Sequence, residues 1–166
     1  MPTDRILIVD DESDMVESWA RLLRSQGYQC FATTASAEAL RLLESEHPDL
    51  LLTDLKMPGT DGMEMLRRAH EIDRQMPVIV LTGHASIESA VAAVKAGAFD
   101  YLAKPSSNDQ LKIAVERALN RRRLELENGH LREQLRDELG FENIVGRSVA
   151  LRQTLELVRK AARAEA

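Results

Sequence analysis

Short apolar runs alternate with segments of helical periodicity along most of the chain. The runs predict five strands, at residues 5–9, 28–33, 49–53, 78–81 and 99–103. Apolar residues at helical spacing predict helices between them, at residues 13–26, 37–45, 61–72 and 87–96, and a last helix from residue 109 onward. Ser13 and Ser86 are expected to be N-caps, and Gly27 and Gly97 to end the helices that those two serines begin.

The alternation of strands and helices indicates the α/β class, because strand–helix–strand units form right-handed crossovers into one parallel sheet. Residues 6–9 are apolar at every position, which is typical of a strand covered on both faces. We therefore predict a five-stranded, doubly wound parallel sheet that is complete by about residue 120.

The last helix shows no stop signal at residue 120, which predicts a helical linker over residues 121–139. Leu124, Leu131 and Leu135, with Asn128 at the matching offset, continue an a/d-like seam through which two copies of the chain could pair as a coiled coil. Gly129 interrupts this seam and costs about 1 kcal/mol of helix propensity. A monomeric helix that folds back on the domain is the alternative.

The formal net charge of −5 is unevenly distributed. Residues 1–120 hold 12 basic and 19 acidic side chains, whereas residues 121–166 hold 10 and 8. Such an acidic first segment is a poor candidate for binding DNA by itself, since phosphate contacts need clustered Lys and Arg. The one basic run, Arg-Arg-Arg at residues 121–123, is interpreted as the solvated face of a helix.

The single cysteine, Cys30, cannot form an intramolecular disulfide, which favours a reducing, cytoplasmic location. No apolar run approaches the roughly 20 residues that a membrane span needs, so no membrane partner is expected. The N-terminus enters a predicted strand almost at once, and we expect no signal peptide.

Candidate chemistry gathers at the carboxyl ends of the predicted strands, where a doubly wound sheet places its functional crevice. Asp10 and Asp11 follow the first strand, Asp54 the third, Thr82 the fourth and Lys104 the fifth. Three adjacent carboxylates repel one another, and proton uptake or a cation would relieve that repulsion. Mg²⁺ suits such a site because it prefers oxygen ligands. The alternative is that these aspartates only cap the helices that follow them.

One carboxylate beside a bound cation could act as a nucleophile toward a phosphoryl donor. Thr82 and Lys104 would then stabilise the charge that spreads over the phosphoryl oxygens. Neither the G-x-x-x-x-G-K-[ST] nor the G-x-G-x-x-G motif occurs in the chain, so the sequence offers no rival Gly-rich phosphate site.

Four motifs stand in order at successive strand ends: Ile-Val-Asp-Asp-Glu at 8–12, Thr-Asp-Leu-Lys-Met-Pro-Gly-Thr-Asp-Gly at 53–62, Leu-Thr-Gly at 81–83 and Ala-Lys-Pro at 103–105. Together they resemble the receiver domain of bacterial two-component response regulators over residues 4 to about 120. The resemblance implies a CheY-like (flavodoxin-like) fold and phosphorylation by a sensor histidine kinase.

The resemblance also implies roles for the acidic residues. Asp54 would be the phospho-acceptor. Asp11, Asp54 and the backbone carbonyl of Lys56 would ligate Mg²⁺, and Asp10 would assist from the outer shell of the metal.

Three further residues have implied roles in the response to phosphate. Thr82 would contact the phosphoryl group, Lys104 would pair with it, and Tyr101 would be an aromatic switch that follows Thr82 inward. Tyr101 as a plain core residue is the alternative. Ser106 stands where regulators of this kind commonly have Phe or another bulky side chain, so packing at the start of the last helix is expected to differ.

The C-terminal part of the chain is similar to a narrower group. Residues 122–135 and Phe-Glu-Asn-Ile-Val-Gly-Arg-Ser at 141–148 resemble the linker and the opening of the AAA+ domain in NtrC-type activators of sigma-54 RNA polymerase. This predicts a receiver domain at 1–120, a coiled-coil linker at 121–139 and an N-terminal AAA+ fragment at 140–166. ATPase activity, DNA binding and sigma-54 contacts would then belong to a parent protein.

Two functions remain as hypotheses. In the first, the chain is a signalling module that catalyses only its own phosphoryl transfer and dephosphorylation, and controls a homodimer formed by the last receiver helix and the linker. In the second, it is a Mg²⁺-dependent phosphatase or hydrolase on a similar sheet. Phosphatases with an aspartate nucleophile carry a second aspartate two residues later, where this chain has Lys56, which disfavours the second hypothesis. Whether phosphorylation relieves repression or activates directly stays open.

Overall fold

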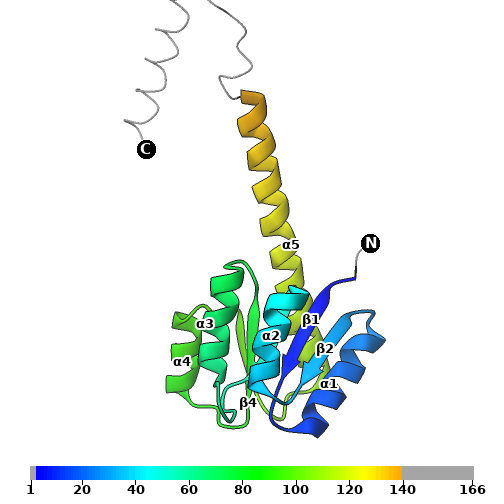
Figure 1. The fold of residues 1–166 in the computed structure, drawn as a ribbon, viewed down its shortest axis with the longest axis vertical. Coiled ribbons are helices and arrows are strands. Elements are labelled where there is room, and N and C mark those ends of the chain that lie inside the picture. The colour runs from blue at the N-terminus through cyan, green and yellow to red at the C-terminus, as the bar shows by residue number, and fades with distance from the viewer. Residues whose placement is uncertain (1–2, 140–166) are drawn as a thin grey trace, which may run out of the picture. The chain divides into compact units, whose positions relative to one another are not determined.

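The computed structural model describes residues 3–139 of the chain (Figure 1). The AAA+ fragment predicted at 140–166 therefore lies outside the described residues. In chain order the elements are β1 (Arg5–Val9), α1 (Ser13–Ser25), β2 (Gln29–Thr33), α2 (Ser36–Glu46), β3 (Leu50–Asp54), α3 (Gly62–Ile72), β4 (Val78–Thr82), α4 (Ile87–Lys95), β5 (Asp100–Ala103) and α5 (Asn108–Leu139). These confirm the predicted elements, with most boundaries within one or two residues.

The five strands form one parallel sheet in the order β2-β1-β3-β4-β5, which confirms the predicted doubly wound α/β fold. The chain reverses its direction of winding between β1 and β3, and such switch points open a crevice outside the carboxyl ends of the strands. The register pairs Val9 with Thr53 and Thr82 with Ala103, so the residues that follow these strands emerge at one edge.

Helices cover both faces of the sheet. Side chains of α1 and α5 pack against one face, which includes Ile6, Ile8 and Leu52. Helices α2 and α3 cover the opposite face over Leu7 and Leu51, and α4 packs there over Val80. Because both faces are buried, the central strands are apolar at almost every position, which is the pattern that identified them in the sequence.

Of the two predicted N-caps, Ser86 is confirmed and Ser13 is wrong. Ser86 caps α4 as expected: its Oγ accepts from the amide of Ser89 at 3.1 Å, and the Ser89 hydroxyl accepts from the amide of Ser86 at 3.1 Å. The prediction for Ser13 is wrong, because Ser13 is the first helical residue and Glu12 is the N-cap of α1, with no side-chain cap. The amide of Glu12 instead donates to Asp10 Oδ1 at 3.0 Å, so the strand-end carboxylate organises this turn.

Helix α5 continues through Gly129 to Leu139 as one helix of 32 residues. The compact unit that contains the sheet ends within it, at Glu125. Arg122 lies inside this unit with its side chain 12% exposed, so the interpretation of the arginine run as a solvated face is wrong for this residue. Acidic groups at the amino edge of the sheet account for the difference, because the Arg122 guanidinium pairs with Asp49 and Asp73. Among the described residues, no helix is long and apolar enough to cross a membrane.

Candidate functional site

Four strand ends place polar side chains at the carboxyl edge of the sheet. Asp10 follows β1, Asp54 ends β3 and Thr82 ends β4, and all three are buried. Lys104 follows β5, and its amide donates to the carbonyl of Thr82 at 2.8 Å, which extends the β4–β5 pairing to this residue. The structure thus brings together side chains that the sequence analysis placed at separate strand ends.

Three carboxylates converge at this edge. Asp10, Asp11 and Asp54 each offer an oxygen within 4.8 Å of the others. Asp10 is fully buried and Asp11 is exposed, so the cluster reaches from the interior of the domain to solvent. Burial raises the pKa of Asp10 above its ordinary value, and the nearby charge of Asp54 adds to the rise, while hydrogen bonds from Lys104 and the Glu12 amide oppose it.

Lys104 is the cation of the site. Its ammonium forms an ion pair with Asp10, and Nζ lies 3.5 Å from Asp54 Oδ1 and 3.6 Å from Glu12 Oε1. Burial alone would lower the pKa of Lys104, but the hydrogen bond and charge of Asp10, with Asp54 and Glu12, outweigh it and raise the pKa. One ammonium does not balance this many carboxylates, so the site keeps a net negative charge.

The two oxygens of Asp54 differ in their contacts. Oδ2 accepts from the amide of Lys56 at 3.2 Å, which fixes the orientation of the carboxylate. Oδ1 is buried and accepts no hydrogen bond from any of the residues that the structure describes. A buried carboxylate oxygen without a donor, beside two further carboxylates, fits a hard divalent cation such as Mg²⁺.

Thr82 makes a polar contact with the loop before α4, and Tyr101 makes one with α4 itself. The hydroxyl of Thr82 accepts from the amide of His84 at 3.1 Å, and the His84 side chain is exposed. Tyr101 is partly buried against Val80 and Ala93, and its hydroxyl lies 2.7 Å from Ser89 Oγ at the start of α4. Tyr101 therefore packs against apolar residues, as the core alternative expects, and it also makes a polar contact that the sequence did not reveal.

The loop after Asp54 depends on two residues that sequence reasoning did not single out. The amide of Gly62 donates to the carbonyl of Leu55 at 2.9 Å, and a Cβ at Gly62 would meet Leu55 Cα at 2.9 Å and the Asp54 carbonyl still closer. Ser36 Oγ donates to the carbonyl of Pro58 at 3.1 Å across 22 residues of sequence. The Asp-Gly pair at 61–62 is a sequence signal for the turn at Gly62. No sequence signal exists for the contact between Ser36 and Pro58.

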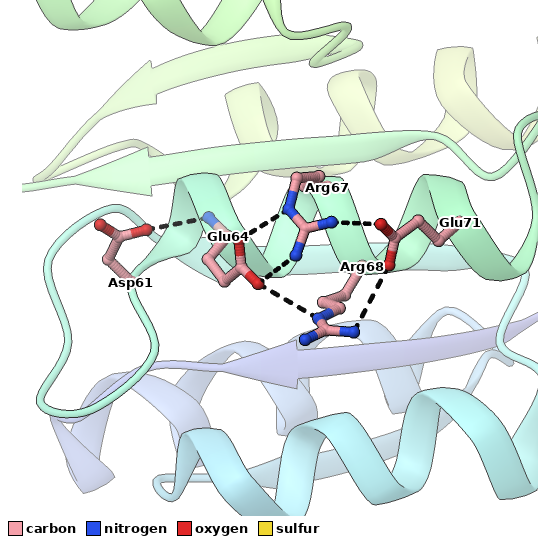
Figure 2. A network of polar contacts seen from close by, with 5 residues as sticks. All are labelled: Asp61, Glu64, Arg67, Arg68 and Glu71. Atoms are coloured by element: carbon pink, nitrogen blue, oxygen red, sulfur yellow. Dashed lines mark hydrogen bonds and ion pairs between the residues drawn. The ribbon is translucent and has the colours of Figure 1, made fainter.

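Helix α3, which begins at this loop, carries a network of exposed charges (Figure 2). Asp61 caps the helix by accepting from the amide of Glu64 at 2.9 Å. Arg67 and Arg68 both pair with Glu64, and Glu71 also contacts both arginines. Hydrogen bonds and charge from Arg67, with Arg68, lower the pKa of Glu64 to about 2. Because these side chains are exposed, the pairs contribute little to stability, and the cap is the contact that positions the helix start.

Comparisons with known proteins agree with this geometry. Residues 6–116 match the response regulator receiver domain family. The chain is 39% identical over 157 residues to the C4-dicarboxylate transport transcriptional regulatory protein DctD of Pseudomonas aeruginosa, covering 93% of this chain and 34% of that protein. It is 39% identical over 115 residues to the DNA-binding transcriptional regulator NtrC of Escherichia coli K12, covering 69% of this chain and 24% of that protein.

Solved structures are also similar to this chain. A receiver domain protein from Clostridium thermocellum superposes with a TM-score of 0.70 at 39% identity, covering 73% of this chain and 98% of that chain. NtrX from Brucella abortus, solved in complex with ADP, superposes with a TM-score of 0.74 at 30% identity, covering 96% of this chain and 34% of that one.

The match to DctD- and NtrC-type regulators confirms the resemblance seen in the sequence motifs. The chain spans about a third of the length of the first curated relatives it matches. Receiver domains generally bind Mg²⁺ at an acidic pocket, and the aspartate cluster at the carboxyl edge has that character. From its family match, its sheet topology and its structural neighbours, the chain belongs to the response regulator receiver domain family.

Proposed function

We propose that this chain accepts a phosphoryl group on Asp54 from a sensor histidine kinase and passes the signal through its last helix. One observation carries the assignment of Asp54. It is the buried carboxylate whose Oδ1 accepts no hydrogen bond within the described part of the chain, and that oxygen lies 3.5 Å from Lys104 Nζ.

In the transfer, an Asp54 carboxylate oxygen attacks phosphorus while the bond between phosphorus and the histidine nitrogen of the kinase breaks. The imidazole leaves with the electron pair of that bond and takes up a proton, and an aspartyl phosphate remains. Lys104 provides positive charge toward the phosphoryl oxygens, and the Thr82 hydroxyl, now bound by the His84 amide, donates to another of them.

We assign the metal ligands to Asp11, Asp54 and the backbone carbonyl of Lys56, with Asp10 in the outer shell. The close approach of the three carboxylates supports this set. The chemistry that bound Mg²⁺ supplies is neutralisation of the negative charge that the carboxylates and the phosphoryl oxygens share. Asp10 keeps the Lys104 ammonium at the site through their ion pair.

Tyr101 is the proposed switch residue, together with Thr82. Movement of Thr82 toward the phosphoryl group leaves space on the β5 side, which Tyr101 enters. The contact between the Tyr101 hydroxyl and Ser89 supports this role, because any displacement of the ring must alter the capping box of α4. Phosphorylation would thus reach a helix surface rather than end at the acidic site.

We propose the division into a receiver at 1–120, a coiled-coil linker at 121–139 and an AAA+ fragment at 140–166. Exposed leucines on α5 support the linker and a homodimer through it, with Leu124 66% and Leu131 53% exposed. The names of the relatives describe transcriptional regulators, one of them DNA-binding, which supports a parent protein that acts on DNA. The proposal of a cytoplasmic parent that contacts sigma-54 RNA polymerase rests on the resemblance of residues 122–135 and 141–148 to NtrC-type activators. The family match does not favour the phosphatase alternative.

The test is phosphorylation of the full chain by acetyl phosphate with Mg²⁺, followed by intact mass spectrometry. We expect the wild-type chain to gain one phosphoryl group, and Asp54→Asn to gain none. Asp109→Asn, at an exposed position of α5, is the matched control and should behave as wild type. Removal of Mg²⁺ with a chelator should slow the wild-type reaction. Phosphorylation of Asp54→Asn at the wild-type rate would contradict the assignment.

A further inference from the structure

Trp19, the only tryptophan of the chain, touches the functional site from α1. Trp19 is 4% exposed and belongs to the apolar cluster between the sheet, α1 and α5. In addition, Lys104 Nζ lies 5.3 Å from the centroid of its ring. That distance is within the range over which an ammonium is attracted to the face of an indole.

The environment of Lys104 makes this contact important. The side chain of Lys104 is 8% exposed, so little water competes with the attraction between ammonium and ring. The ammonium sits on a flexible four-carbon stem, and its ionic partners among the described residues, Asp10, Asp54 and Glu12, all pull it toward the acidic cluster. Trp19 also contacts the ammonium, but it lies in the apolar cluster under α1 and not in the acidic cluster.

We propose that Trp19 is a positioning residue for Lys104, and that its indole face keeps the ammonium in place beside Asp54 during phosphoryl transfer. The inference rests on the proposed role of Lys104 in that transfer. A tryptophan that only fills the core would stabilise the fold equally well with or without the ammonium over its ring. The two roles differ in whether the effect of Trp19 on the reaction depends on Lys104.

A double-mutant cycle on the full chain separates these roles, with the rate of phosphorylation by acetyl phosphate and Mg²⁺ as the readout. Trp19→Leu should slow the reaction about tenfold, whereas Trp19→Phe, which keeps a weaker aromatic face, should stay within about threefold of wild type. Lys104→Met should slow the reaction strongly, and adding Trp19→Leu to Lys104→Met should slow it no further.

Leu119→Ala is the matched control. Leu119 belongs to the same apolar cluster but lies on α5 eleven residues beyond its start, toward the opposite edge of the sheet. Thermal unfolding of each variant shows whether the compared chains are folded and equally destabilised. Leu119→Ala should be phosphorylated at the wild-type rate. If Trp19→Leu is no slower than Leu119→Ala, or slows Lys104→Met as much as it slows wild type, the inference is overturned.

Trp19 emission provides a measurement that does not require a tryptophan variant to fold. Because the chain has one tryptophan, a change in its emission on Lys104→Met reports the ring beside the ammonium. We expect a shift in intensity or wavelength, and an unchanged spectrum would overturn the contact. The proposed function fails separately, if Asp54→Asn is phosphorylated or if Lys104→Met reacts at the wild-type rate.

Discussion

Arg122 holds α5 against the body of the receiver, and its removal should cost measurable stability. Nη1 lies 2.7 Å from Asp73 Oδ2, just after α3, and Nε lies 3.5 Å from Asp49 Oδ1, just before β3. Arg122→Met keeps the length and the helix propensity of the side chain while it removes the charge and the planar donors. The substitution therefore tests the ion pairs with little change to the helix itself.

The size of the effect follows from the exposure of the partners. Exposed pairs contribute about 0–1 kcal/mol, and removing one partner of a buried pair costs about 3–5 kcal/mol. Arg122 is 12% exposed, but the side chains of Asp49 and Asp73 are 29% and 34% exposed. Water can solvate these carboxylates once the arginine is gone, so we expect Arg122→Met to lower the free energy of unfolding by about 1–2 kcal/mol.

The effect should depend on pH. Burial alone would raise the pKa of Asp73, but the amide of Gln75 and the Arg122 guanidinium outweigh it, and the pKa is lowered from 3.8. A carboxyl group with a lowered pKa in the folded state contributes stability that is fully present above its unfolded pKa and is lost as pH falls through the folded value. The difference between wild type and Arg122→Met should therefore be full at neutral pH and shrink below pH 3.8.

Urea unfolding followed by circular dichroism, at neutral and acidic pH, measures both expectations. Arg117→Met is the matched control, because Arg117 is an exposed arginine of α5 for which no ion pair occurs among the described residues. Its unfolding midpoint should stay near that of wild type at either pH. Equal midpoints for the Arg122→Met and Arg117→Met variants, or a difference that persists unchanged in acid, would refute the role of these ion pairs.

Three further substitutions have defined outcomes. Gly62→Ala should lower the free energy of unfolding by about 1–3 kcal/mol in thermal or urea unfolding, because its Cβ would collide with the backbone of the loop after Asp54. Ser106→Ala should raise the free energy of unfolding by about 1 kcal/mol, because the buried Ser106 hydroxyl has no hydrogen-bond partner in the described range. Ser107→Ala should lower the free energy of unfolding, because it removes a hydroxyl that accepts from the Gln110 amide. In analytical ultracentrifugation, Leu131→Glu should shift the full chain toward monomer, and Arg132→Glu, outside the leucine seam, should not; a monomeric wild-type chain at high concentration would contradict the proposed coiled coil.

The sheet and the acidic edge could be predicted because both depend on local patterns. Continuous apolar runs marked strands buried on both faces, and the parallel arrangement placed the residues after those strands at one edge. Asp54 and Lys104 were therefore expected to lie close together although β4 separates their strands in the sheet. The order of the parallel strands was therefore enough to predict that Asp54 and Lys104 lie close together, without knowledge of side-chain packing.

Contacts between helices and distant loops could not be predicted in this way. The pairing of Arg122 with Asp49 and Asp73 depends on the rotation of α5 about its axis, which periodicity fixes only to within the apolar face. The position of Trp19 over Lys104 likewise depends on a rotamer inside a packed core. An apolar pattern assigns both residues to a face, but it does not identify the charge that each one meets there.

The two edges of the sheet should therefore respond to different substitutions. Asp49 precedes β3 and Asp54 ends it, and every residue of that strand is buried between neighbours on both sides, so the strand is poorly suited to transmit a displacement along its length. The contact between Tyr101 and Ser89 lies beside β5, the outermost strand of the sheet, where Tyr101 and α4 are less buried than β3. We expect Arg122→Met to lower stability without changing the rate at which acetyl phosphate phosphorylates the chain. We expect Tyr101→Ala to leave Asp54 reactive and to remove the response of α4 to phosphorylation. A phosphorylation rate that falls in Arg122→Met, measured where the variant is fully folded, would show that the two edges are coupled through β3 after all.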